Sequence, residues 1–340
     1  MILVYVLANP LISVIIPLYN EPELVQRAIL SVQEQSLKDV EIIVVDDCST
    51  NVTAPSMVEA MRKQDPRISL YLLKENSGPF FARIVGIHKS TGSYLMFLDA
   101  DDYYNDQNIL QTAYNTAIAQ KADLVHFREQ VRDVTGFNPF VWANPVVNSS
   151  QNALYGVKQW ALNGQGTALH GKLIQRDVIL KGMSKIQEFM GDFFKFKLYY
   201  SEDILMMLGI YLYAEKYEPI EDIGYTYNIY ESSLSITSQV EFEKVVKRAE
   251  STIYALQIVK QMLADTGKDL QRHIRFQIAK LSKNTISKAK VINEDQKAEI
   301  CKMFLESGLL NAKYIKETIN EECMFLFDEY RSVMNQPSYD

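Results

Sequence analysis

The stretch ISVIIPLYNEPELVQRAILSVQEQSLKDVEIIVV, residues 12–45, contains two apolar runs separated by a segment of different periodicity. ISVIIP (12–17) and EIIVV (41–45) are almost continuously apolar, which is typical of strands buried on both faces of a parallel sheet. Between them, apolar residues recur at helical spacing from about Pro22 to Gln35, and Pro22 suits the first turn of a helix. The stretch therefore predicts a strand, a helix and a second strand parallel to the first.

Three more apolar runs follow, ISLYLL (68–73), YLMFL (94–98) and DLVHF (123–127), and a further helical pattern begins after Gly78. This alternation predicts an α/β fold with a parallel sheet. In open parallel sheets, ligands bind at the carboxyl ends of the strands. Four polar segments follow the expected strands and should therefore form one site: LYNE (18–21), DDCST (46–50), ENSG (75–78) and DADD (99–102).

The pattern changes twice further along the chain. After the first α/β part comes a region rich in Gly, Asn, Pro and aromatic residues, and the last third has apolar residues at helical spacing with almost no proline. We therefore expect three parts: an α/β half at residues 1–130, a second half that closes over the sheet at 131–237, and a helical C-terminal region at 238–340.

Composition narrows the classes of partner and compartment. The formal net charge is −7, whereas nucleic-acid-binding proteins usually present a basic surface, so no nucleic-acid partner is expected. The three cysteines are far apart and form no metal-binding or disulfide pattern, which fits a cytoplasmic protein. Residues 1–17 are apolar but lack a basic leading segment and are interrupted by Asn9 and Pro10, so we interpret them as a strand rather than a signal or an anchor.

The segment SYLMFLDADDYYND (93–106) places three aspartates, Asp99, Asp101 and Asp102, directly after an apolar strand. Clustered carboxylates repel one another, and burying them without partners costs several kcal/mol. A D-x-D pattern at a strand end offers hard oxygen ligands that can converge on Mg²⁺ or Mn²⁺. Asp-rich turns also end strands for conformational reasons, so this motif alone leaves both interpretations open. A second acidic strand end, VVDDCST (44–50), favours a ligand site.

Two of these stretches together resemble the nucleotide-sugar domain of the family 2 glycosyltransferases, which have the GT-A fold. They are residues 12–50 and ENSGPFFARIVGIHKSTGSYLMFLDADD (75–102). The motifs match in order and spacing over roughly the first 105 residues. Later, LHGKLIQRDVILKG (169–182) and YYSEDILMM (199–207) resemble acceptor-side motifs of bacterial lipooligosaccharide galactosyltransferases. The resemblance implies that residues 1–130 bind a nucleotide-sugar and that residues 131–237 bind the acceptor.

The resemblance also implies roles for residues at the strand ends. Those that would hold the uracil and ribose of a UDP-sugar are Pro17, Tyr19, Glu21 and Asp47, and Arg83 would flank the nucleotide. Cys48 stands where the family usually has glycine, a change that we expect to alter packing only.

For the aspartate cluster, the resemblance implies that Asp99 faces the ribose or the metal, that Asp101 binds the metal and the diphosphate, and that Asp102 shares this role. The expected cofactor is Mn²⁺ or Mg²⁺, with the UDP-sugar donor as co-substrate. The UDP leaving group gains negative charge as its bond to the sugar breaks, and a metal held by Asp101 would offset that charge.

The two later motifs contain further candidates. We place Lys172 with the nucleotide-binding residues, although a role as surface charge explains Lys172 and Arg176 equally well. A lone histidine such as His170 is more often structural than a ligand. In YYSEDILMM, Asp203 could cap a helix or take the proton of an acceptor hydroxyl. The resemblance favours Asp203 as the catalytic base, with Glu202 orienting it or contacting the acceptor.

The segment KDLQRHIRFQIAKLSKNTISKAK (268–290) has seven Lys or Arg residues against one Asp, and it places Leu270, Ile274, Ile278 and Leu281 on one stripe. Such a helix could lie on the inner face of an anionic membrane, where a lipid-linked acceptor would be found. Packing on its own domain or on a second copy in a homodimer is the favoured alternative, because most amphipathic helices pack in this way.

The combined hypothesis is an inverting glycosyltransferase that moves a hexose, with galactose as a candidate, from a UDP-sugar to a lipooligosaccharide, lipopolysaccharide or capsule acceptor. Two alternatives are a metal-dependent nucleotidyltransferase, which also uses acidic residues at a sheet edge, and a non-catalytic glycan-binding or assembly subunit. Release of UDP rather than pyrophosphate separates the first alternative from the hypothesis. The intact acidic clusters disfavour the second alternative.

Overall fold

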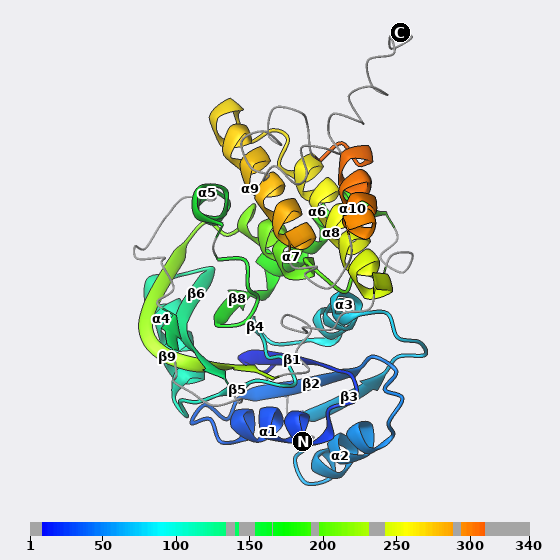
Figure 1. Cartoon of the computed structure of the whole chain (residues 1–340). Coiled ribbons are helices and arrows are strands. Elements are labelled where there is room, and N and C mark those ends of the chain that lie inside the picture. Colours follow the sequence, from blue (N-terminus) through cyan, green and yellow to red (C-terminus); the bar gives the residue numbers. More distant parts are fainter. Residues whose placement is uncertain are drawn as a thin grey trace, which may run out of the picture.

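The computed structural model describes residues 9–133, 140–142, 154–164, 166–191, 197–230, 242–287 and 294–309. Figure 1 shows a curved sheet with helices on both faces and further helices, from the C-terminal part, stacked at one end. The strands are β1 (Ile12–Leu18), β2 (Val40–Asp46), β3 (Ile68–Leu72), β4 (Tyr94–Phe97), β5 (Tyr103–Tyr104), β6 (Leu124–Asp133), β7 (Phe140–Trp142), β8 (Lys172–Gln175) and β9 (Tyr217–Ile229). The helices are α1 (Pro22–Gln33), α2 (Thr53–Arg62), α3 (Pro79–Lys89), α4 (Ile109–Gln120), α5 (Tyr155–Asn163), α6 (Arg176–Met190), α7 (Glu202–Tyr211), α8 (Phe242–Met262), α9 (Lys268–Ser287) and α10 (Glu294–Glu306).

The strands form one sheet in the order β3-β2-β1-β4-β8-β6-β9-β5, with β7 paired to β6. The pairs among β1 to β4 are parallel, as expected from their apolar runs. Beyond β4 the sheet is mixed, because β8 runs antiparallel to both of its neighbours while β6 and β9 are parallel. The α/β fold predicted from the sequence is therefore confirmed, and the five expected strands correspond to β1 to β4 and the start of β6.

The boundary that we expected at residue 130 falls inside β6. The sheet continues across it, because the middle part of the chain supplies β7, β8 and β9. The following helices, α8 and α9, pack against α5, α6 and α7 rather than standing apart. The site is consequently built from segments of all three expected parts, held on one continuous sheet.

Side chains of the central strands fill a hydrophobic core on each face of the sheet. Val14 and Ile16 on β1 belong to the hydrophobic cluster that includes residues of α1, α2 and α4, whereas Ile15 belongs to the cluster that includes residues of α3, α6 and α7. All three are completely buried, and burying such a side chain contributes about 1.5–3 kcal/mol. Burial on both faces explains why β1 and β2 are almost continuously apolar in sequence.

The apolar stripe of α9 faces the interior of the protein. Ile274 and Ile278 are each 1% exposed and belong to the core cluster, and Leu270 and Leu281 pack beside it. This confirms the alternative in which the stripe packs on its own domain. Among the side chains of α9 that the structure describes, four basic residues are exposed: Lys268, Arg272, Arg275 and Lys280. In the described part of the chain, no helix is both long and apolar enough to span a membrane.

Candidate active site

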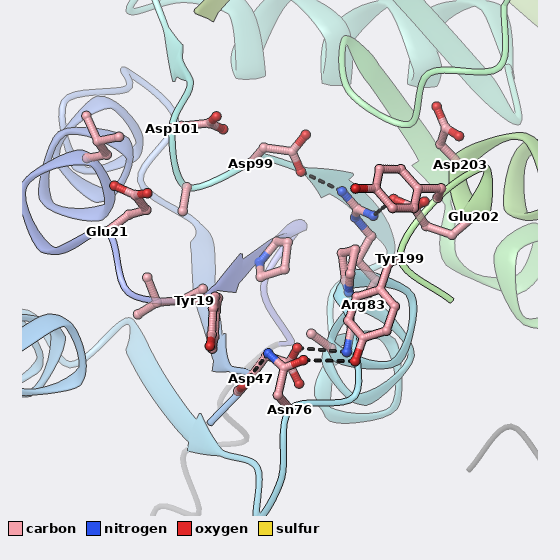
Figure 2. A pocket seen from close by; sticks show the side chains of 18 of the residues that line it. Tyr19, Glu21, Asp47, Asn76, Arg83, Asp99, Asp101, Tyr199, Glu202 and Asp203 are labelled. Carbon is pink, nitrogen blue, oxygen red and sulfur yellow. Dashed lines mark hydrogen bonds and ion pairs between the residues drawn. The ribbon is translucent and has the colours of Figure 1, made fainter. Parts of the chain in front are cut away.

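A cleft of about 660 Å³ opens at the carboxyl ends of β1, β2 and β4. We call its lining residues between Pro17 and Asp101 the strand-end wall, and those between Tyr199 and Arg248 the opposing wall. The opposing wall combines the segment before α7, the start of α7, the end of β9 and one residue of α8. Figure 2 shows that carboxylates from both walls surround the cleft. The volume suits a ligand of the size of a small organic molecule or nucleotide.

The strand-end wall contains the predicted residues Pro17, Tyr19, Glu21 and Asp47. The carboxylate of Asp47 accepts backbone hydrogen bonds from Ser77, at 2.7 Å, and from Gly78, at 2.8 Å. Gly78 has a φ of +87°, and a Cβ there would lie 2.7 Å from the Leu198 carbonyl oxygen. Glycine is therefore required at this turn, which holds Asp47 in the cleft.

Two further residues at this end were not predicted from the sequence. Asn76 donates a hydrogen bond of 3.1 Å to the backbone oxygen of Asp47, and the hydroxyl of Tyr199 donates one of 3.1 Å to the Asn76 side chain (Figure 2). Asn76 lies in the ENSG segment, which was expected at the site, so the sequence already indicated that this residue lies near the cleft. Tyr199 comes from the opposing wall, and nothing in its local pattern indicates that it reaches the ENSG turn.

Arg83 joins the two walls. Its guanidinium forms an ion pair with Asp99 at 2.6 Å and a second with Glu202 at 2.9 Å (Figure 2). Burial alone would lower the pKa of Arg83, but the two carboxylates raise it, so the group stays charged. Arg83 lines the cleft, and its guanidinium is committed to two protein carboxylates; its expected position beside the nucleotide stays a prediction.

Asp99 and Asp101 lie on the strand-end wall, beyond the end of β4. Burial and the neighbouring Asp99 raise the pKa of Asp101 to about 6. For Asp99, burial acts in the same direction, but the charges of Arg83 and His170 outweigh it and lower its pKa. Excess negative charge at Asp101 is what a bound cation would relieve.

The donor set fits a divalent cation that is shared with a substrate. Carboxylate oxygens are the ligands that Mg²⁺ and Mn²⁺ prefer, and Mg²⁺ is commonly held by one or two carboxylates together with substrate phosphates. Among the described residues, no group of three or more His, Cys, Asp or Glu side chains could hold a metal ion alone. A cation at Asp99 and Asp101 would therefore depend on oxygens from the substrate.

Asp102 differs from its neighbour Asp101. It is completely buried and is not part of the cleft lining, and its carboxylate accepts hydrogen bonds from the Tyr225 hydroxyl at 2.6 Å and the Asn228 backbone at 2.7 Å. Burial, together with Asp101 and Asp99, raises its pKa well above the usual range. We expected Asp102 to share the metal, but its side chain instead ties the end of β4 to β9.

Glu202 and Asp203 begin α7 and line the opposing wall. Burial raises the pKa of Glu202 to about 7, and it also raises the pKa of Asp203. The Arg83 ion pair holds Glu202, whereas one oxygen of Asp203 accepts the Ile204 backbone hydrogen bond at 2.8 Å. The structure thus brings both predicted catalytic residues into the cleft, and it also gives Asp203 a backbone contact in the first turn of the helix.

Lys172 lies outside the cleft lining, contrary to the expected nucleotide contact. It is 1% exposed and donates hydrogen bonds to the backbone oxygens of Ala168, at 2.6 Å, and His170, at 3.4 Å. Burial lowers its pKa to about 8. His170 is paired with Glu129 at 2.6 Å and stacks on Tyr225, with ring centroids 4.7 Å apart. Both residues hold the loop before β8 in place behind the cleft.

The fold is that of the GT-A glycosyltransferases. Residues 13–181 match the model of the family "Glycosyl transferase family 2", and the chain belongs to that family. The S. aureus protein TarS, residues 1–349, has a similar structure in complex with UDP-GlcNAc, with a TM-score of 0.55 at 17% identity over 95% of this chain and 92% of that one.

Relatives in sequence are also glycosyltransferases. Glycosyltransferase GlyG of Streptococcus pneumoniae is 26% identical over 319 residues, which cover 90% of this chain and 99% of that protein. The GalNAc(5)-diNAcBac-PP-undecaprenol beta-1,3-glucosyltransferase of Campylobacter jejuni is 40% identical over 116 residues, which are 34% of this chain and 35% of that protein. The chain spans half or less of the length of several other curated relatives that it matches.

Proposed function

We propose that the protein is an inverting, metal-dependent hexosyltransferase that uses a UDP-sugar donor and a bacterial surface glycan as acceptor. The observation that carries this proposal is the arrangement of carboxylates: Asp99 and Asp101 lie on the strand-end wall, and Glu202 and Asp203 face them from the opposing wall. One set suits the diphosphate and its cation, and the other suits the acceptor hydroxyl. Such a division is what a single displacement between two bound substrates needs.

The nucleotide would lie at the end of the cleft that contains Tyr19, Asp47 and Asn76. Tyr19 is 44% exposed and offers an aromatic face to a uracil ring. Asp47 and Asn76 are fixed by the ENSG turn and offer hydrogen-bonding groups for the base and the ribose. Because these groups are held by backbone contacts, this part of the site is formed before the donor binds.

The diphosphate would then lie near Asp99 and Asp101, where a divalent cation fits. When bound, that cation supplies a positive charge that stabilises the departing diphosphate. Asp101 would hold the cation, and Arg83 keeps Asp99 ionised and oriented. Glu21, on the same wall, adds to the negative charge around Asp101.

The acceptor hydroxyl would approach from the side of Asp203. Asp203 takes the hydroxyl proton as that oxygen attacks the anomeric carbon opposite the diphosphate, which inverts the configuration. Glu202 is held by its ion pair with Arg83, so its role is to orient the start of α7 and the acceptor. The raised pKa of Asp203 makes it a stronger base than an exposed aspartate.

The printed names of similar proteins support the substrate classes. TarS was solved with UDP-GlcNAc, and the C. jejuni relative transfers glucose to a lipid-linked glycan by its name. These names support a UDP-hexose donor and a lipid-linked or surface-glycan acceptor, and galactose stays one donor to test among several. Discrimination between such sugars depends on single hydrogen bonds in the pocket.

We also propose that the exposed basic side of α9 contacts anionic lipid. Its apolar stripe is buried in the core, so the contact would be electrostatic and would weaken at high salt. Sedimentation with vesicles containing or lacking anionic lipid tests this contact. Equal sedimentation with both would contradict it.

A direct test of the proposed reaction is a panel of nucleotide sugars screened for product release with Mn²⁺ and with EDTA. We expect UDP release from one UDP-hexose, increased by a glycan acceptor and abolished by EDTA. Pyrophosphate as the product would instead indicate nucleotidyl transfer. Nucleotide binding without turnover with any acceptor would indicate a binding subunit.

A further inference from the structure

Helix α8 comes from the C-terminal part of the chain, yet it holds the segment that begins α7. The hydroxyl of Ser251 accepts backbone hydrogen bonds from Tyr199, at 3.2 Å, and Tyr200, at 3.0 Å, and it donates one of 2.9 Å to the Tyr200 oxygen. Thr252 contacts Ser201 through their hydroxyls at 3.1 Å. The position of the opposing wall therefore depends on one face of α8.

Arg248 lies on the same face of α8, one turn before Ser251, and lines the cleft. Its guanidinium lies over the ring of Tyr200, 4.9 Å from the ring centre. A guanidinium that is attracted to an aromatic ring through its charge still has N–H groups with which to donate hydrogen bonds. The contact with Tyr200 thus holds the guanidinium at the cleft.

The two arginines of the cleft lining differ in their partners. Arg83 is ion-paired with Asp99 and Glu202, so its charge is already balanced. Arg248 forms no ion pair with any residue in the described part of the chain. It is half-buried and lines a cleft whose other charged residues are mostly carboxylates. A cation in this position suits an anionic ligand.

We propose that Arg248 binds the diphosphate of the nucleotide-sugar donor. This inference rests on the proposed function and adds a residue from the C-terminal region to the donor site. Arg248 would donate hydrogen bonds to phosphate oxygens and would share with the cation the charge that grows on the departing diphosphate. Charge-assisted hydrogen bonds of this kind are roughly twice as strong as neutral ones, and a guanidinium matches the geometry of phosphate oxygens.

The test compares the binding of UDP and uridine by calorimetry in the presence of Mn²⁺, using the full chain and the Arg248→Gln variant. The substitution should weaken UDP binding by at least about tenfold and should leave uridine binding within about twofold, because uridine lacks the diphosphate. Arg248→Lys keeps the charge without the fork of donors and should have an intermediate effect. A loss of structure would weaken both ligands equally, so the difference between them separates the proposed role from a structural one.

Lys247→Gln is the matched control, because it removes one positive charge from the neighbouring position. Lys247 is exposed, pairs with Glu243 at 2.9 Å and is not part of the cleft lining. It should leave UDP binding unchanged. Equal UDP affinity in Arg248→Gln and the unmodified protein would overturn this inference alone, as would a loss confined to kcat/KM for the acceptor. Failure of the unmodified protein to bind UDP or uridine would overturn the proposed function itself.

Discussion

The two walls of the cleft are built in different ways. The strand-end wall comes from one stretch of the chain between Pro17 and Asp101, and the parallel strands β1, β2 and β4 bring its segments together at one edge. The opposing wall combines α7, β9 and α8, which are far apart in sequence. Backbone pairing positions the first wall, whereas side-chain contacts through Arg83 and Ser251 position the second. We therefore expect single substitutions to disturb the geometry of the opposing wall more easily.

The largest effect is expected at Asp203 on the opposing wall. Asparagine can accept the same backbone hydrogen bond from Ile204 but cannot take a proton, so Asp203→Asn should retain the helix contact and lose the base. We expect kcat to fall by about 10²-fold or more, with UDP affinity unchanged. Steady-state kinetics at saturating acceptor, together with UDP calorimetry, measure both quantities.

Asp177→Asn is the matched control for this prediction. Asp177 lies in the first turn of α6, is exposed and does not line the cleft. The substitution Asp177→Asn should therefore leave kcat unchanged. A near-normal kcat in Asp203→Asn would mean that Asp203 only supports the helix, and the base would then have to be sought elsewhere, starting with Glu202.

On the strand-end wall, the same substitution at two adjacent aspartates should give opposite results. Asp101→Asn removes a ligand from the expected cation site and should lower kcat/KM by about 10- to 10²-fold, with a weaker response to Mn²⁺. Asp102 has a pKa well above the usual range because of burial, so a neutral amide should be tolerated there. Asp102→Asn should keep kcat/KM within about threefold, since neither ligand nor charge is lost from the cleft.

Titrations of activity with Mn²⁺ for both variants decide between these outcomes. Equal losses in the two variants would contradict the assignment of Asp102 to the core contact with Tyr225 and Asn228. Full activity of Asp101→Asn in EDTA would contradict the metal requirement. Thermal unfolding of both variants checks that the comparison is made between folded proteins.

A smaller effect is expected where α8 holds the opposing wall. Ser251→Ala removes the acceptor of two backbone N–H groups, so it should lower the free energy of unfolding by about 1–3 kcal/mol. Because the same segment leads into Glu202 and Asp203, we also expect kcat to fall by about threefold to tenfold, through the displaced base. Urea unfolding and steady-state kinetics measure the two effects.

Ser282→Ala on α9 is a suitable control for Ser251→Ala. Ser282 is buried like Ser251, but its hydroxyl donates to the backbone oxygen of Ile278 in its own helix, at 2.9 Å. It should leave kcat unchanged. If both alanine variants had the same kcat as the unmodified protein, α8 would not control the geometry of the opposing wall.

How far the sequence predicts the site follows from this difference between the walls. Continuous apolar runs mark β1 to β4, and polar residues directly after them lie at one sheet edge by geometry, so Tyr19, Glu21, Asp47 and Asp101 could be found without a structure. Pro17, at the end of an expected strand, was indicated only by the family resemblance. The pattern could not separate Asp101 from Asp102, because the direction of each side chain after a strand depends on the partner strand β9. Tyr199 and Arg248 were missed because only tertiary packing brings them to the cleft. Lys172 was misplaced because a lysine in a short strand gives no sign of being fully buried.

The smallest expected effect concerns a left-handed backbone conformation that occurs on both sides of the cleft. Cys48, next to Asp47, has a φ of 58°, and Ser201, before Glu202, has a φ of 63°. This conformation costs a residue with a Cβ roughly 1–2 kcal/mol relative to its favoured conformations, but glycine adopts it freely. The sulfur of Cys48 makes only a weak contact of 3.7 Å with the Lys74 oxygen, whereas Ser201 is hydrogen-bonded to Thr252 at 3.1 Å.

Cys48→Gly should therefore raise the free energy of unfolding by about 0.5–1 kcal/mol, after the greater freedom of glycine in the unfolded chain is included. Ser201→Gly should change it by less than about 0.5 kcal/mol, because relief of strain is offset by loss of the hydrogen bond. Urea unfolding of both variants measures the difference, and a destabilised Cys48→Gly would show that the cysteine packs usefully beside the expected nucleotide site.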